Sequence, residues 1–282
     1  MSEIELAEKY LPYVDEEFTQ ESKISLLTNR DFKFTGANSV KVYKVSTSNM
    51  NDYGRRYKGG GQYGPVEELS ATTEEFILRN DRSFTFVIDA LDEDETEESL
   101  EAASALARQI REKVIPEVDT NCYKKMTQNA GIKPSPIILT DENIYEEILK
   151  ANCALDDALV PETGRVLTVT PSVYLLMKKC KDITMNTEIG NDMRIKGVIG
   201  NIDGDIVIKI PSTRLPEDFG FMLAHPCATV APVKLASYKT HTNPPGINGT
   251  LTEGRICYDA FVLENKAKAI YYQAQPVEPE TE

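Results

Sequence analysis

The sequence predicts an α+β fold, and three observations support this class. Residues 40–45 and 84–88 are runs rich in β-branched and aromatic residues, which favour strands. Apolar residues recur at spacings of three and four from Leu100 to Val118, which predicts a long amphipathic helix. Asp203-Gly204 lies between two further apolar runs, and this pair is typical of a tight β-hairpin turn.

The composition limits the class of protein. The 282 residues include 41% hydrophobic and 27% charged residues, which is typical of a globular chain with one large domain or two smaller ones. No apolar stretch reaches the roughly 18 residues of a membrane span, and the acidic start lacks the apolar segment of a secretory signal. We therefore expect a chain made in a cytosol, without a membrane partner.

The charge balance is strongly negative. The chain has 31 Lys and Arg residues against 45 Asp and Glu residues, which gives a formal net charge of −14. Because each phosphate contact needs a basic side chain, this balance argues against a protein that recognises nucleic acid. Five widely spaced cysteines without a Cys-x-x-Cys pair predict free thiols in a reducing compartment: Cys122, Cys153, Cys180, Cys227 and Cys257.

The first part of the chain is expected to form an arm followed by a hairpin. The residues before Glu21 are acidic, with too few apolar anchors to fold alone. Residues 40–45 predict a strand whose expected partner is the region 76–88, and residues 49–71 between them are polar and rich in glycine. Fixing one residue's backbone costs roughly 1–2 kcal/mol, so ordering about a dozen residues at the tip costs on the order of 10–20 kcal/mol. We expect this tip to stay mobile or to be held by another molecule.

A very acidic segment, residues 89–101, leads into the clearest helix of the chain. Its carboxylates suit a helix N-terminus, because the helix dipole favours negative charge there. The apolar stripe continues to Met126, so we expect the helix to end near Gly131, with a kink or a break at Pro116.

Shorter elements are expected in the second half of the chain. Thr140 or Asp141 should cap a helix whose apolar stripe runs to Leu159. Pro171 favours the first turn of a further helix that ends at Cys180. The other predicted elements are strands at 165–169, 198–202, 206–210, 219–224, 256–262 and 269–272, and a rigid turn at 243–246.

No set of residues predicts a catalytic, cofactor or metal site. Residues 59–64 have the glycine spacing of a dinucleotide-binding loop, but no strand–turn–helix unit surrounds them. His225 and Cys227 could form a base-and-nucleophile pair, although a partly buried histidine beside a core thiol is the simpler interpretation. Two carboxylate pairs are explained by a solvated helix face and by turn chemistry: Asp156 with Asp157, and Asp203 with Asp205.

A set of short segments, taken in order, carries a family resemblance. They are Asp31-Phe32-Lys33-Phe34-Thr35-Gly36, Val40-Lys41-Val42-Tyr43, Asn51-Asp52-Tyr53, Asp81-Arg82-Ser83-Phe84-Thr85-Phe86, Val114-Ile115-Pro116-Glu117-Val118-Asp119, Ala158-Leu159-Val160-Pro161, Val198-Ile199-Gly200-Asn201-Ile202-Asp203-Gly204, Ala231-Pro232-Val233-Lys234, Pro244-Pro245-Gly246, and residues 253–262. In their order and coverage they resemble the major capsid proteins of tailed bacteriophages with the Hong Kong 97 type fold. The resemblance spans nearly the whole chain.

The resemblance implies a division of the chain into named parts. It implies an N-terminal arm (1–35), an extended β-hairpin loop (36–90), a peripheral domain with a long spine helix (91–135), an axial domain (136–236), return strands of the peripheral domain (237–275) and an acidic tail (276–282). The implied function is the coat of an icosahedral head that encloses the genome of a phage or prophage, and not an enzyme. It implies no cofactor.

The implied partners are many copies of the same chain, arranged as hexamers and pentamers, together with a scaffolding protein, a portal protein and packaged double-stranded DNA that is not read for sequence. The implied location is the virion, with assembly in the cytoplasm of a bacterial host. An acidic wall fits this role, because it does not hold DNA phosphates.

One contact between copies is a hypothesis from charge. A cluster of basic residues near the hairpin tip is expected to meet the acidic segment of a neighbouring copy: Arg55, Arg56 and Lys58 with Asp92, Glu93, Asp94, Glu97, Glu98 and Glu101. Exposed pairs contribute about 0–1 kcal/mol each, so they would set register rather than supply affinity. The alternatives are an encapsulin-type nanocompartment shell, an α+β enzyme using the His225 and Cys227 region, and a minor structural or decoration protein of a phage.

Overall fold

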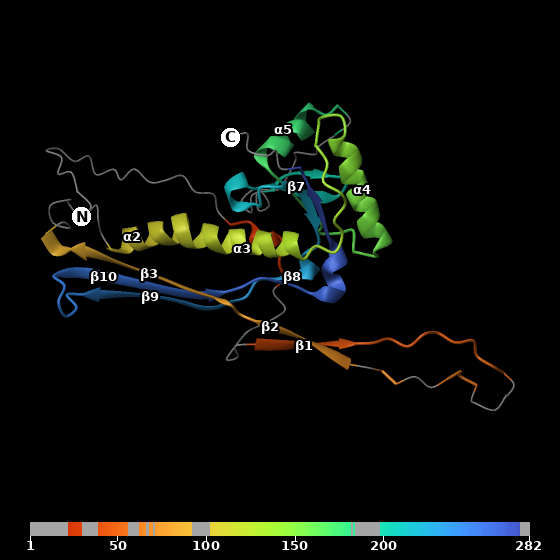
Figure 1. Cartoon of the computed structure of the whole chain (residues 1–282), viewed down its shortest axis with the longest axis horizontal. Helices are drawn as coiled ribbons and strands as arrows, with labels where there is room; N and C mark the ends of the chain where they lie inside the picture. The colour runs from red at the N-terminus through yellow and green to blue at the C-terminus, as the bar shows by residue number, and fades with distance from the viewer. Residues whose placement is uncertain are drawn as a thin grey trace. The chain divides into compact units, whose positions relative to one another are not determined.

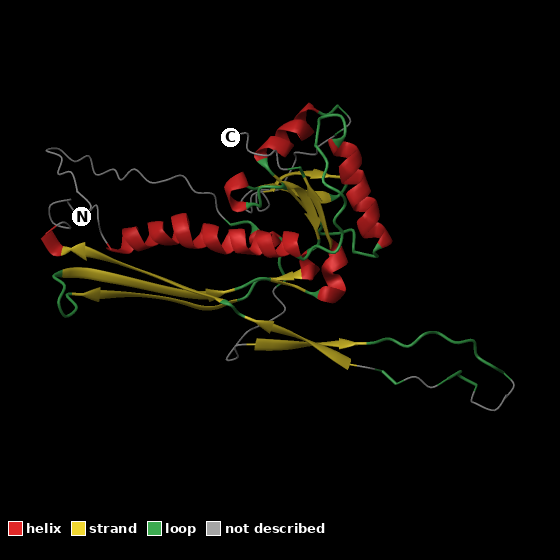
Figure 2. Ribbon diagram, viewed as in Figure 1, coloured by secondary structure: helices red, strands yellow, loops and turns green. Residues whose placement is uncertain are grey.

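The computed structural model describes residues 22–29, 39–55, 62–65, 68–69, 71–91, 102–181, 183 and 198–276 (Figures 1 and 2). The chain divides into two compact units. One is Phe34–Arg79, and the other is Met1–Lys33 together with Asn80–Glu282. Each unit is described by itself below.

The smaller unit is built on one antiparallel pair of strands. β1 (Ser39–Val45) pairs with β2 (Ala71–Ile77) along the full length of both strands. Lys44 and Glu74 form an ion pair of 3.1 Å across the two strands. The predicted strand at residues 40–45 is confirmed. The region 76–88 was expected to pair with this strand. That expectation is wrong for most of the region, because only residues 76 and 77 belong to β2.

A three-stranded antiparallel sheet in the larger unit takes the remainder of that region. β3 (Asn80–Asp89), β10 (Gly249–Tyr258) and β9 (Val233–Thr242) lie in the order β3-β10-β9. β3 leaves the hairpin because all of its residues pair with β10. Residues 80–90 of the predicted extended loop therefore belong to the larger unit. The predicted rigid turn between β9 and β10 is present, with Asn243 at a φ of 48°.

One long helix lies along this sheet (Figure 1). It consists of α2 (Ala102–Gln109), a π-helical turn η2 (Ile110–Val114) and α3 (Ile115–Gln128). A proline has no N–H and its ring clashes with the carbonyl four residues earlier, so the wider π turn before Pro116 lets the helix continue. The predicted long helix is confirmed, with a π turn in place of a break.

The helix is joined to the sheet by polar contacts, and the sheet itself is closely packed. Glu117 Oε1 accepts a hydrogen bond from Arg82 Nε at 2.7 Å and another from the Tyr258 hydroxyl at 3.0 Å. On the sheet, Gly254 lies under the ring of Phe84, where an added Cβ would come within 2.3 Å of the ring. This close approach requires glycine in the middle of β10.

The second sheet of the larger unit has five strands in the order β12-β7-β4-β6-β5. β4 and β6 run parallel, and the other neighbouring strands described in this sheet run antiparallel. The predicted strands in residues 165–224 are confirmed as β4 (Val166–Val169), β5 (Val198–Ile202), β6 (Asp205–Lys209) and β7 (Phe219–Ala224). The predicted turn is also present, since Asp203 and Gly204 have φ angles of 49° and 94°.

The last strand is placed differently from the expectation. β12 (Ile270–Ala274) was expected to return with residues 237–275 to the peripheral sheet. It pairs instead with β7 in the five-stranded sheet, because all of its residues are buried there. The predicted strand 256–262 is interrupted: β10 ends at Tyr258, and the short β11 (Phe261–Val262) pairs with β8 (Thr229–Val230).

Both faces of the five-stranded sheet are covered. Side chains alternate along β4, so Val166 packs with Cys122 and Met126 of α3 on one face. Leu167 packs on the other face with α4 (Ile144–Asp157) and α5 (Pro171–Lys179). The sheet therefore lies between the long helix and the two shorter helices.

The two ends of α4 are closed by different devices. Thr140 N donates to Asn143 Oδ1 at 2.8 Å, and Asn143 N donates to Thr140 Oγ1 at 3.3 Å. Thr140, one of the two expected cap residues, therefore closes the start of α4 by exchanging hydrogen bonds with Asn143. At the other end, Leu159 has a φ of 58° and Val160 N donates to Leu155 O. Leu159 was expected on the buried stripe. That expectation is wrong: the left-handed turn leaves its side chain 91% exposed.

A segment from the N-terminal part of the chain is anchored to the larger unit. Around η1 (Ile24–Leu26), Ile24 and Leu27 are buried, and Lys23 Nζ donates to Lys209 O at 2.9 Å. Burial, with Lys209 and Arg214 nearby, lowers the pKa of Lys23. The predicted arm is therefore fixed at residues 22–29, and its earlier residues lie outside the described part of the chain.

Candidate assembly surfaces

The hairpin unit extends beyond its strand pairing into a loop, and the described residues on its two sides contact each other. Gly54 N donates to Gln62 O at 2.9 Å, and the Tyr53 hydroxyl donates to Gln62 Oε1 at 2.7 Å. The rings of Tyr53 and Tyr63 meet edge to face with centroids 5.1 Å apart. These contacts join residues 51–55 to residues 62–64 and define the closure of the loop.

This loop exposes large apolar side chains. Met50 is 99% exposed, Tyr63 81%, Leu69 61% and Tyr53 53%. Aromatic side chains with a hydroxyl at one end are well suited to interfaces, because the ring can be buried while the hydroxyl keeps a polar partner. Among the described residues of the hairpin unit, the loop therefore presents apolar and aromatic side chains to solvent.

The predicted basic cluster at the tip is only partly visible. Arg55 lies in the described loop and is exposed. The other residues of the proposed charge contact lie outside the described residues: Arg56, Lys58, Asp92, Glu93, Asp94, Glu97, Glu98 and Glu101. The contact between the basic tip and the acidic segment stays a prediction.

The glycine motif at residues 59–64 is described only from Gln62. Gly64 has a φ of 84°, and a Cβ at this position would lie 2.8 Å from the side chain of Asn51. A positive φ and close packing explain this glycine as part of the loop closure. Residues 59–61 lie outside the described part.

His225 and Cys227 form a capping turn. His225 Nδ1 accepts from the backbone N–H of Cys227 at 3.2 Å, so Nε2 carries the proton and donates to Thr163 O at 3.2 Å. Burial lowers the pKa of His225, and burial raises the pKa of the Cys227 thiol. An activated nucleophile needs a lowered thiol pKa and a base directed at the sulfur, so this geometry does not support the enzyme hypothesis.

The carboxylate pairs divide between two roles. Asp156 accepts a hydrogen bond of 2.6 Å from Arg165, while its neighbour Asp157 is exposed on the helix. Asp203 is in the hairpin turn, and Asp205 accepts from Asn152 Nδ2 at 2.8 Å. Burial raises the pKa of Asp205 to about 6. Within the described ranges, no group of three or more His, Cys, Asp or Glu residues could hold a metal ion.

Arg165 is a structural residue that sequence reasoning missed. Its guanidinium is almost fully buried and donates to Asn152 Oδ1, to Asp156 and to the backbone carbonyls of Val160 and Pro161. Five donors in a planar fork allow this one side chain to hold the whole turn after α4. The sequence shows only an arginine before an apolar strand, which carries no signal of this role.

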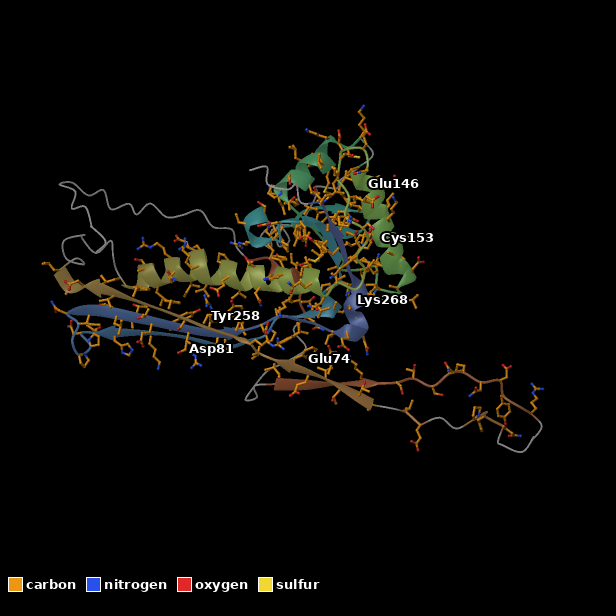
Figure 3. The ribbon with its side chains drawn as sticks, viewed as in Figure 1. Glu74, Asp81, Glu146, Cys153, Tyr258 and Lys268 are labelled. Carbon is orange, nitrogen blue, oxygen red and sulfur yellow. The ribbon has the colours of Figure 1, made fainter. Side chains whose placement is uncertain are left out.

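The outer faces of α4 and α5 are also available for contact. Glu146 and Cys153 lie along α4 (Figure 3), and both are exposed. Leu149 on α4 is 42% exposed and Leu175 on α5 is 55% exposed. None of the helices in the described part of the chain is long and apolar enough to cross a membrane.

Comparisons with known proteins locate this architecture among solved structures. A scan against protein-family models and a search of curated proteins gave no match. A chain from the capsid structure of the cyanophage P-SCSP1u matches with a TM-score of 0.71 at 14% identity, covering 96% of this chain and 93% of that chain. A chain of the bacteriophage PhiM1 mature capsid matches with a TM-score of 0.69 at 13% identity, covering 97% and 93%. This chain has the Hong Kong 97 type capsid fold.

Two further structures bear on the alternatives. A chain of Mycobacterium phage Che8 matches with a TM-score of 0.68 at 18% identity, covering 95% of this chain and 96% of that chain. The virus-like particle from Pyrococcus furiosus matches with a TM-score of 0.54 at 13% identity, covering 90% and 92%. These three phage chains are thus closer in structure to this chain than the archaeal particle is.

Proposed function

We propose that this chain is the major capsid protein of a tailed double-stranded DNA bacteriophage or prophage. The observation that carries the proposal is the nearly complete coverage of both chains in the match to capsid structures of phages. Because almost nothing is left over on either side, the match supports a shell subunit rather than one domain of a different protein. A fold alone does not give a function, so the proposal also needs surfaces suited to assembly.

The hairpin unit supplies such a surface. Met50 and Tyr63 are largely exposed, and the described residues of their loop are joined through Gln62 and the two tyrosine rings. We expect this loop to pack on a neighbouring copy, with Tyr53 and Tyr63 as apolar anchors. The basic residues Arg55, Arg56 and Lys58 would then set the register against the acidic segment of that neighbour, as charge complementarity does at other interfaces.

The proposed partners follow from this role. Copies of the chain would form hexamers and pentamers, and a scaffolding protein and a portal protein would act with them during assembly in the bacterial cytoplasm. The finished shell would be part of the virion and would enclose double-stranded DNA. The net charge of −14 fits an inner wall that does not hold the packed phosphates.

The test is assembly of the expressed chain, with and without the scaffolding protein, measured by sedimentation and negative-stain microscopy. Closed particles of uniform diameter support the proposal. A chain that stays a monomer under both conditions contradicts it. The charge contact is tested by reversing Arg55, Arg56 and Lys58 to Glu, and undiminished assembly at low salt would discard that contact alone.

The second candidate is an encapsulin-type shell, which would have the same fold and a protein cargo. The match to the virus-like particle from Pyrococcus furiosus favours it, although the TM-score of 0.54 is lower than the 0.71 of the cyanophage capsid. Analysis of the contents of native particles separates the two candidates. Double-stranded DNA supports the phage capsid, and a packaged enzyme supports the nanocompartment.

A further inference from the structure

The turn after α4 combines two unfavourable features in one residue. Leu159 has a φ of 58°, a conformation that L-residues with bulky side chains rarely adopt, and its side chain is 91% exposed. Glycine at this place would remove the strain, and a polar residue would remove the exposed apolar surface. Strained residues persist where the surrounding structure fixes them, and they cluster at functional sites.

The surrounding structure fixes this turn firmly. Arg165 donates hydrogen bonds to the carbonyl oxygens of Val160 and Pro161 and to the Asp156 carboxylate. The backbone N–H of Leu159 donates to Asp156 O at 2.8 Å. An apolar side chain held on a rigid turn loses little conformational entropy when a partner covers it, so the turn is preorganised for binding. We call residues 156–162 the Leu159 turn.

A surface of complementary character lies on the same unit. Leu175 on the outer face of α5 is 55% exposed, and Lys178 and Lys179 lie three and four residues further along the same face. The exposed Lys181 follows just after the end of this helix, so three lysines close together in the sequence accompany one exposed apolar side chain. We call Leu175, Lys178, Lys179 and Lys181 the α5 patch. The Leu159 turn has the opposite charge, because the exposed Asp157 and Glu162 flank its leucine.

The two surfaces lie apart in the larger unit, since α5 and the C-terminal end of α4 are separated in the view of Figure 1. The Leu159 turn of one molecule therefore cannot contact the α5 patch of the same molecule. Two different, complementary surfaces on one chain favour head-to-tail contact, and such contacts close into rings when the rotation per subunit fits. We propose that the Leu159 turn of one copy docks on the α5 patch of the next copy. This inference rests on the proposed function as a shell subunit.

The decisive variant is Leu159→Gly. Glycine accepts the positive φ, so the unassembled chain should fold with equal or higher stability, measured by urea denaturation. The apolar anchor is lost, and we expect the protein concentration needed for assembly to rise about tenfold or more. The matched control is Ile138→Ala, because Ile138 is 70% exposed on the same unit but belongs to neither surface. The control should assemble like the unmodified chain.

Charge reversal tests the pairing itself. The variant with Asp157→Lys and Glu162→Lys should assemble poorly, and so should the variant with Lys178→Glu and Lys179→Glu. All four changes in one chain should restore assembly, because each head-to-tail contact regains opposite charges. Assembly is followed by sedimentation and negative-stain microscopy at low salt, since screening weakens exposed charges.

The outcomes separate this inference from the proposed function. If the unmodified chain and the Ile138→Ala control form particles while Leu159→Gly and both charge reversals assemble just as well, the docking contact is overturned and the shell function stands. If the variant with all four charge changes assembles as poorly as the two double variants, the pairing of these two surfaces is overturned. If the unmodified chain forms no particles, the shell function fails, and the docking contact fails with it.

Discussion

Arg214 donates a hydrogen bond of 2.8 Å from Nη1 to Oδ2 of Asp119, and both side chains are almost fully buried. Asp119 lies on α3, and its other carboxylate oxygen accepts from Ser22 Oγ at 2.7 Å. The pair therefore ties the long helix both to the 3-10 turn η3 (Ser212–Arg214) and to the anchored N-terminal segment. Burial raises the pKa of Asp119 against the opposing effects of Ser22 and Arg214.

The first prediction concerns this pair. Asp119→Ala removes the carboxylate that faces the buried Arg214 charge, which should lower the free energy of unfolding by about 3–5 kcal/mol. The double variant Asp119→Leu with Arg214→Met removes both charges and should lose much less. Urea denaturation of the unassembled chain measures both. Equal losses in the single and double variants would contradict the account of a buried charge pair.

The second prediction compares two arginines. Arg165→Lys removes the fork that holds two carbonyls, an amide and a carboxylate, and should cost about 2–4 kcal/mol of stability. Arg255→Lys is the control, because Arg255 pairs with Asp81 on an exposed strand face, where such pairs contribute about 0–1 kcal/mol. Differential scanning calorimetry should show a large fall in Tm only for the Arg165 variant. Similar Tm values for the two variants would refute the assigned role of Arg165.

The third prediction concerns close backbone packing. A Cβ on Gly131 would lie 2.5 Å from backbone atoms of Ala267 and Lys268, in the 3-10 turn η5 (Glu264–Ala269). Gly131→Ala must displace that backbone and should cost about 1–3 kcal/mol or more. Gly204→Ala meets no atom within 4 Å and suffers only from its φ of 94°, so about 1 kcal/mol is expected. Chemical denaturation compares the free energies of unfolding of the two variants. A larger loss for Gly204→Ala than for Gly131→Ala would be inconsistent with the structure.

The fourth prediction concerns pH. The pKa of Asp205 is raised to about 6 in the folded chain from an ordinary value of 3.8. Between these two pH values the folded state binds more protons than the unfolded state, so Asp205 makes stability fall as pH rises from about 4 to about 6. Asp205→Asn removes this contribution. The difference in unfolding midpoint between the variant and the original chain should grow across this range, and a constant difference would speak against the raised pKa.

Elements controlled by local chemistry could be predicted from the sequence. The Asp203-Gly204 turn, the helix that begins at Pro171 and the stripe of the long helix all depend on neighbouring residues, and the structure confirms them. The fold class followed from these elements together with the resemblance in their order. The π turn could not be predicted in detail, although Pro116 marked its place.

Elements controlled by distant pairing could not be predicted. β9 mixes polar and apolar residues, and it is a strand because β10 pairs with it. β12 pairs with β7, and β3 pairs with β10 rather than continuing the hairpin of β1 and β2. In both cases the partner strand is far away in the sequence. Leu159 was assigned to a buried stripe because helix periodicity carries no sign of a left-handed turn. The surface around Leu159 was missed for the same reason.

In the proposed shell, the hairpin loop becomes rigid only when copies of the chain pack together. The most direct measurement is hydrogen exchange of the loop amides of residues 51–55 and 62–64, compared between the dilute single chain and assembled particles. We predict fast exchange in the single chain, moderated only at Gly54 by its bond to Gln62, and strong protection in the particles. Full protection of these amides in the dilute single chain would contradict the account.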